Sequence, residues 1–170
     1  MLEQCIQELT CNGSKLLTFD DICYQLNTEN FVPNGYGCLH WNEAWYVNTS
    51  ILNPATVSTT AKQSGQYVIL NANGTNMQVA VMNNSTDRFD LLSFFANAFQ
   101  YNGTKLVLGG LRLATKVYAK NFTLNRSPAA TINLNWTNLT SFTYQTYYTG
   151  LQGPGYQVVI DNLLVNLYEL

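Results

Sequence analysis

Apolar and polar residues alternate with a period of two through most of this chain. In the stretch TINLNW, Ile132, Leu134 and Trp136 alternate with Asn133 and Asn135. Such alternation predicts a strand with one face in a core and the other in solvent, with Trp136 inside and Asn135 outside. Further stretches follow a similar pattern, at 14–19, 35–41, 44–48, 65–72, 77–82, 104–113, 115–124, 141–148 and 155–170.

The segment 87–99 is the one place where a helix competes with a strand. Phe89 and Leu92 have roughly helical spacing, but the Phe content and the position between strands favour a strand. Turn signals separate the strands, as at 33–35, 73–74, 102–103 and 153–155. Strands without intervening helices in a chain of 170 residues predict an all-β fold, a single jelly-roll β-sandwich of about 9–10 antiparallel strands.

The triplet Asn-x-Ser/Thr, the acceptor signal for N-linked glycans, occurs ten times. The chain has 21 Asn and 26 Ser plus Thr residues, from which chance placement predicts only about three triplets. The excess predicts a secreted, extracellular glycoprotein in which most sites are occupied. The acceptor residues are Asn12, Asn48, Asn73, Asn83, Asn84, Asn102, Asn121, Asn125, Asn135 and Asn138.

Charged side chains are few. They make up 11% of the residues and the net charge is -2, so the composition predicts no nucleic-acid partner, which would need a basic stripe for its phosphates. No apolar run reaches the roughly 18 residues of a membrane helix, so no membrane span is expected.

Four cysteines lie in the first 38 residues: Cys5, Cys11, Cys23 and Cys38. An even number of clustered cysteines in a secreted chain predicts two disulfides. Four cysteines allow three pairings, and we expect Cys5 with Cys11 and Cys23 with Cys38. The alternative is reduced thiols or a zinc site, which the absence of Cys-x-x-Cys and of a suitably spaced His disfavours.

Seven stretches follow one another in a specific order and spacing. They are LTFDD (17–21), VPNGYGCLHW (32–41), WYVN (45–48), FDLLSFFANAF (89–99), GGLRLATKVYAKNFTLN (109–125), INLNW (132–136) and VVIDNLLVNLYEL (158–170). Together they resemble a family of extracellular β-sandwich domains that is common in bacterial secreted proteins, many of which carry the PEP-CTERM sorting tag.

The resemblance implies a jelly-roll sandwich of the carbohydrate-binding-module type, closed by pairing of the first and last strands. It implies a domain at 17–170 that follows a disulfide-bearing N-terminal leader at 1–16. Members of that family are generally regarded as non-catalytic extracellular modules. Cys38 stands where the family usually has Gly, and the family lacks both the leader and most of the glycan triplets. These departures favour a glycosylating host.

Three carboxylates could form one metal site if the terminal strands are neighbours. Asp20 and Asp21 near the start can then approach Asp161 near the end, and hard oxygen ligands of this kind suit Ca²⁺. A structural calcium ion is the one cofactor that the sequence predicts. The alternative is that one Asp caps a turn and another satisfies backbone N–H groups.

Exposed aromatic rings are candidates for glycan binding, because sugar-binding faces stack pyranose rings on Trp and Tyr. The candidates are Trp41, Trp45, Tyr46 and Tyr147. β-Sheets also use aromatic residues in their cores. The core alternative is favoured for Trp41 and stays open for Trp45 and Tyr46.

The sequence gives little support for a catalytic site. The single His, His40, lies in the apolar stretch CLHW, and the chain has no Gly-x-Ser-x-Gly elbow. A glycosidase needs only two carboxylates, and the ten acidic residues include possible pairs, but none lies in a recognisable motif. We therefore expect no enzymatic activity.

Two classes of function remain. We expect a structural or assembly subunit of an extracellular coat, matrix or filament, which contacts copies of itself, because dense glycans would crowd an open ligand face. The alternative is a carbohydrate-binding, lectin-like module for extracellular glycans, which the aromatic residues favour. A sheet face free of glycan triplets would mark the functional surface.

Overall fold

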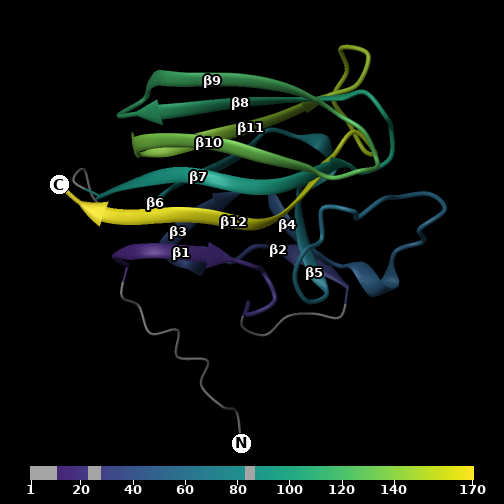
Figure 1. Cartoon of the computed structure of the whole chain (residues 1–170), viewed down its shortest axis with the longest axis horizontal. Coiled ribbons are helices and arrows are strands. Elements are labelled where there is room, and N and C mark those ends of the chain that lie inside the picture. Colours follow the sequence, from purple (N-terminus) through teal and green to yellow (C-terminus); the bar gives the residue numbers. More distant parts are fainter. Residues whose placement is uncertain (1–10, 23–27, 83–86) are drawn as a thin grey trace, which may run out of the picture.

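The chain folds into a jelly-roll β-sandwich. The computed structural model describes residues 11–22, 28–82 and 87–170. Within these residues, strands of two antiparallel sheets pack face to face (Figure 1). The described residues include no helix that is long and apolar enough to cross a membrane.

Sheet A contains the two longest strands at its centre. In spatial order its strands are β10 (Ala130–Leu139), β7 (Asp87–Ala98), β12 (Val158–Glu169), β5 (Tyr67–Asn71), β4 (Ala44–Asn48) and β2 (Glu29–Phe31). The first strand, β1 (Gly13–Leu17), pairs with the second half of β12, whereas β5 pairs with its first half. The predicted pairing of the first and last strands is therefore confirmed.

Sheet B lies behind and above sheet A in Figure 1. Its strands, in spatial order, are β3 (Leu39–Asn42), β6 (Met77–Val81), β11 (Ser141–Tyr147), β8 (Thr104–Arg112) and β9 (Thr115–Leu124). In the described part of the chain, three short 3-10 turns lie between strands: η1 (Tyr36–Cys38), η2 (Thr49–Ile51) and η3 (Ala72–Gly74).

The main core fills the space between the sheets. β7 and β12 supply Phe94 and Ile160 from sheet A, and β8 and β11 supply Leu108 and Phe142 from sheet B; all four are at most 1% exposed. Trp136 is also buried, as the alternation predicted. These buried residues alternate with outward-facing ones, because successive side chains of a strand point to opposite faces.

A second apolar cluster covers part of the outer face of sheet A. Val47, Val68 and Val159 point outward from β4, β5 and β12, and Val57 and Ala61 pack on them from the segment that follows η2. An antiparallel sheet often keeps one face in solvent. Here the segment 52–66 covers much of one such face, and the outer face of sheet B keeps its solvent contact.

The predicted disulfide pairing is wrong. Cys11 bonds to Cys38, with the Cα atoms 5.5 Å apart, because the start of β1 and the end of η1 lie side by side in the fold. Cys5 and Cys23 lie outside the described residues. The expected boundary between leader and domain falls inside β1, whose residues 13–16 pair with β12 as part of the sandwich.

Candidate functional site

The outer face of sheet B presents rows of polar side chains. Strand pairing places Tyr147, Lys105 and Thr123 side by side in one row across β11, β8 and β9. The next row consists of Gln145, Val107 and Asn121. All six side chains are exposed or half-exposed. Two further rows toward β3 add mainly polar residues, among them Thr143, Gln78, Asn42 and His40.

A shallow hollow of about 360 Å³ lies at the Tyr147 end of this face. Lys105, Asn121, Thr123 and Tyr147 line it, and Gly150 in the turn after β11 forms its rim. The volume lies in the range of about 300–1,000 Å³ that is usual for small-ligand sites. The Tyr147 ring therefore stands beside several hydrogen-bonding groups.

Hydrogen bonds orient the side chains around the hollow. The Lys105 Nζ donates to Thr123 Oγ1 at 2.7 Å, and the Tyr147 hydroxyl donates to Gln145 Oε1 at 3.3 Å. Asn and Gln side chains supply both donors and acceptors. The arrangement can stack on the apolar face of a sugar ring while amide, hydroxyl and ammonium groups meet its hydroxyl edge.

The other candidate aromatic residues lie elsewhere. Trp41 and Tyr46 are 5% and 3% exposed and belong to the main core, so the core alternative describes both. Trp45 is half-buried on the outer face of sheet A, where its ring meets Phe31 edge to face at 5.3 Å. Only Tyr147 among the four presents its ring beside the hollow.

Tyrosines around the last long turn contact one another. The rings of Tyr148 and Tyr156 both pack against the ring of Tyr101, with centroid distances of 4.9 and 5.4 Å. Tyr144 points into the core and donates its hydroxyl to the carbonyl of Val158, and burial raises the pKa of that hydroxyl well above its usual value. Their contacts are those of packing residues.

The three carboxylates of the calcium prediction accept hydrogen bonds from the protein. Asp20 accepts from the backbone N–H groups of Gln66 and Tyr67, and Asp161 from that of Gln63. Asp21 accepts from the hydroxyl of Tyr36. Among the described residues, no three His, Cys, Asp or Glu side chains group as metal ligands. The hydrogen bonds match the alternative role, and calcium binding stays a prediction.

The glycan acceptors differ in exposure. Asn48 is only 5% exposed and caps η2 with its side-chain oxygen, and Asn138 is half-buried. Asn83 and Asn84 lie outside the described residues. The exposed acceptors are Asn12, Asn73, Asn102, Asn121, Asn125 and Asn135. One of these, Asn121, lies in the hollow itself.

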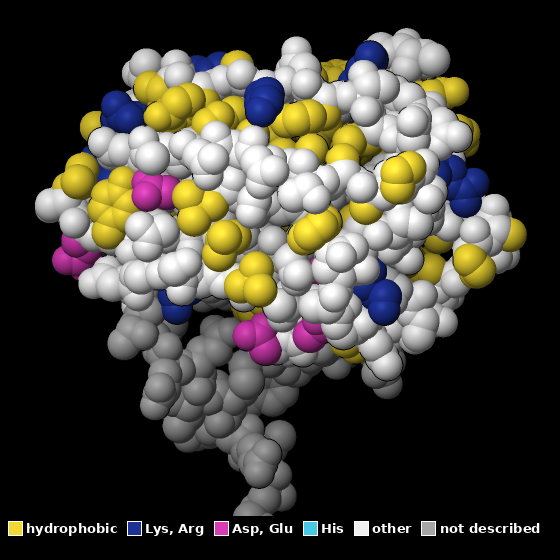
Figure 2. Space-filling model, viewed as in Figure 1, with side chains coloured by type: hydrophobic (Ala, Val, Ile, Leu, Met, Phe, Trp, Pro, Cys, Tyr) yellow, Lys and Arg dark blue, Asp and Glu magenta, His cyan; other side chains and the backbone are white. Residues whose placement is uncertain are grey.

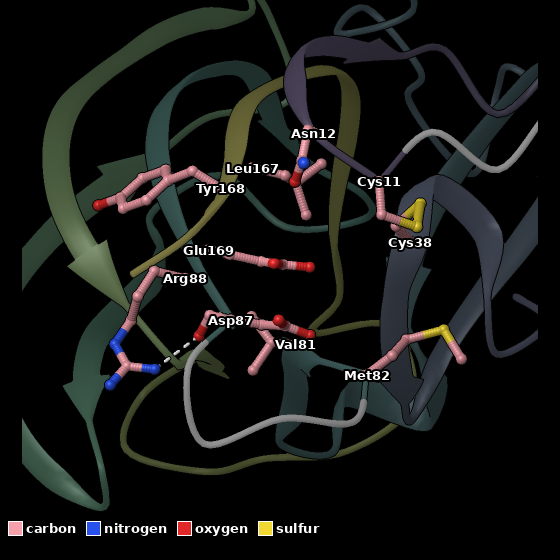
Figure 3. A pocket seen from close by; sticks show the side chains of 10 residues that line it. All are labelled: Cys11, Asn12, Cys38, Val81, Met82, Asp87, Arg88, Leu167, Tyr168 and Glu169. Atoms are coloured by element: carbon pink, nitrogen blue, oxygen red, sulfur yellow. Dashed lines mark hydrogen bonds between the residues drawn. A yellow bond between two sulfur atoms is a disulfide. The ribbon is translucent and has the colours of Figure 1, made fainter.

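A second hollow, of about 270 Å³, lies beside the disulfide. Asp87 and Glu169 are cross-strand partners on β7 and β12, and their carboxylates point into it (Figure 3). The ring of Tyr168 points away, and its hydroxyl donates to Asp90. Because it turns no aromatic ring inward, this hollow suits a sugar less well than the Tyr147 hollow does.

Sequence reasoning missed most of the residues that surround Tyr147. Alternation along β8 places Lys105 and Val107 on one face, but it does not say which residues of β9 and β11 lie beside them. That information is in the register, which joins Val107 to Asn121 and Gln145. The short gap between the predicted strands 104–113 and 115–124 was the available signal for pairing β8 with β9.

No family model matches the chain, and no curated protein matches it. The resemblance to the PEP-CTERM-associated family therefore stays a prediction.

Several solved structures are similar to this chain. TmCBM61 in complex with beta-1,4-galactotriose is 11% identical, covers 83% of this chain and 99% of its own, and has a TM-score of 0.40. The Stig cyclase Fisc from Fischerella sp. TAU is 9% identical, the match covers 92% of this chain and 98% of the cyclase, and the TM-score is 0.49. A family 16 carbohydrate binding module is 14% identical, the match covers 66% of this chain and 84% of the module, and the TM-score is 0.36. At these low identities and scores, nothing about ligand or activity follows for this chain.

Proposed function

We propose that this chain is a non-catalytic glycan-binding domain, and that the outer face of sheet B binds the sugar. The observation that carries the proposal is the hollow in which the Tyr147 ring stands beside Lys105, Asn121 and Thr123. A sugar ring has an apolar face and a polar edge, and this site offers both an aromatic surface and convergent hydrogen-bonding groups.

The shape of the sheet edges supports binding over the assembly role that the sequence favoured. β10 contains two register shifts, with Asn135 and Asn138 at positive φ, and such bulges hinder pairing with another strand. The edge strands β2 and β3 are only three and four residues long. β9 is longer but carries Lys116 and Lys120, and edge lysines oppose strand addition. Assembly into a coat, matrix or filament is therefore the less supported proposal.

Replacing Tyr147 with alanine tests the site. The loss of an aromatic anchor is expected to weaken glycan binding by about thirtyfold, or about 2 kcal/mol. Affinity electrophoresis against a panel of neutral and acidic polysaccharides identifies a ligand, and isothermal titration with its oligosaccharide gives the affinity of each variant. Circular dichroism confirms that the variant stays folded.

Phe31→Ala is the matched control, because Phe31 is an exposed aromatic residue on sheet A, 52% accessible. We expect it to bind as the unchanged protein does. Loss of binding in Phe31→Ala with full binding in Tyr147→Ala would move the site to sheet A. A protein that none of the polysaccharides retards would overturn the proposal.

We also propose that the protein is secreted and glycosylated. The Cys11–Cys38 disulfide supports secretion, since such bonds persist in oxidising compartments. Glycans are expected on exposed acceptors such as Asn73 and Asn102 but not on Asn48, because its side chain is buried and caps η2, which leaves no room for a glycan in the fold. Asn121 is expected to be free, because a glycan there would fill the hollow. Intact mass and site mapping of the natural protein check this, and full occupancy of Asn121 would contradict the proposed site.

A further inference from the structure

We propose that the ligand of sheet B is an acidic glycan, whose carboxylate or sulfate groups bind Lys105 and Lys116. This inference rests on the proposed function and specifies the chemical class of the sugar.

The charges of the chain are strongly divided along its length. Residues 91–160 contain five Lys or Arg residues and no Asp or Glu, whereas the rest of the chain contains three basic and ten acidic residues. The two parts therefore carry +5 and -7, which together give the net charge of -2. The basic part forms β8, β9, β10 and β11, and so supplies most of sheet B. The low overall charge hides this division.

Two of these cations lie on the outer face of sheet B. Lys105 stands in the row of Tyr147. Lys116 extends over Gly109, where an added Cβ would lie 3.2 Å from its Cε and 3.7 Å from its Nζ. Residues 105 and 109 of β8 are about 13 Å apart along the strand, at roughly 3.3 Å per residue. The two ammonium groups therefore flank the row of Asn121 and Gln145.

The neighbouring cations are engaged at the seam between the two sheets. Lys120 donates to the carbonyl of Asn133 and lies over the Phe122 ring, and Arg112 donates to the carbonyl of Asn138. In Figure 2, several Lys and Arg side chains lie along the top, where β8 and β9 lie, and others lie at the right and lower down, whereas the Asp and Glu side chains of this view all lie below the top. The rows on β3, β6, β11, β8 and β9 that make up the outer face contain no carboxylate among the described residues.

This charge pattern favours an anion over a neutral sugar. A lysine ammonium has three donors and no acceptor, so it pairs best with acceptor-only groups such as carboxylate and sulfate. A face that carries lysines and no carboxylates also attracts anions before contact, and salt weakens this attraction. A neutral glycan would gain only the hydrogen bonds and the ring contact at Tyr147.

Binding measurements with four polymers test the inference. They are polygalacturonate, dextran sulfate, neutral dextran and polyglutamate, a polyanion without sugar rings. We expect at least one acidic polysaccharide to bind tenfold or more tightly than dextran and polyglutamate, with an affinity that falls as salt is raised. The double variant Lys105→Gln/Lys116→Gln is expected to lose about tenfold in that affinity and most of the salt dependence. Lys62→Gln, an exposed lysine on the segment that covers sheet A, is the matched control and is expected to change nothing.

Each outcome is decisive. Preference for polygalacturonate supports a carboxylate ligand, and preference for dextran sulfate supports a sulfate ligand. Binding of a neutral polysaccharide as tight as that of the acidic ones, unaffected by the lysine changes, overturns the inference and leaves the proposed function standing. Equal binding of polyglutamate, or no binding of any polysaccharide, overturns both.

Discussion

Replacing Asp161 with asparagine is expected to lower the free energy of unfolding by about 3 kcal/mol, because buried donors left without an acceptor each cost about 1–3 kcal/mol. Asp161 is fully buried at a bulge in β12, and its Oδ2 accepts from the N–H groups of Gln63 at 2.7 Å and Ser64 at 3.0 Å. Its Oδ1 accepts from the N–H of Asn162 at 2.7 Å, so the amide NH₂ of an asparagine would face at least one backbone N–H in either orientation. Burial raises the pKa of the Asp161 carboxyl, and the three surrounding N–H groups act in the opposite direction.

Urea unfolding near neutral pH measures this loss, with Asp21→Asn as the control. Asp21 is exposed and accepts from the hydroxyl of Tyr36, which can also donate to an asparagine oxygen, so the change for Asp21→Asn is expected to stay within about 0.5 kcal/mol. An equally small change for Asp161→Asn would mean that the segment 63–64 is not held to β12 by this carboxylate.

The double variant Cys11→Ser/Cys38→Ser is expected to lose about 3.5 kcal/mol, the chain-entropy value for a closed loop of this length. The two cysteines are 27 residues apart, and their bond ties the start of β1 to the end of η1. Urea unfolding again measures the effect. When both proteins are reduced, the difference between them is expected to disappear. Peptide mapping that links Cys5 to Cys11, or Cys23 to Cys38, would contradict the observed pairing.

The strands were predictable because their signal is local. The bounds of β4 and β9 coincide with the predicted 44–48 and 115–124, and the segment 87–99 forms β7 as favoured. β2 was missed because its three residues are all exposed and give no alternation. The predicted strand at 35–41 begins with η1 instead, where Gly35 and Gly37 adopt positive φ.

Features that depend on tertiary neighbours were less accessible. Cysteine pairing was misjudged because spacing does not reveal that η1 folds back onto the start of β1. The residues of the candidate site were hard to predict for the same reason, because the register of three strands brings Lys105, Asn121 and Tyr147 together. Tyr147 itself was named from the sequence, but the same reasoning named Trp41 and Tyr46, which pack in the core. Burial separates these residues, and burial depends on which face each strand turns inward.

The most direct test of the central claim is to map a bound oligosaccharide onto the sheets. Uniformly ¹⁵N-labelled protein is titrated with an oligosaccharide of the tightest-binding polysaccharide, and the backbone amide shifts are followed by NMR. We expect the largest shifts in β8, β9 and β11 around Val107, Asn121 and Tyr147. Shifts concentrated around Phe31 and Trp45, or around the hollow beside the disulfide, would contradict binding on the outer face of sheet B.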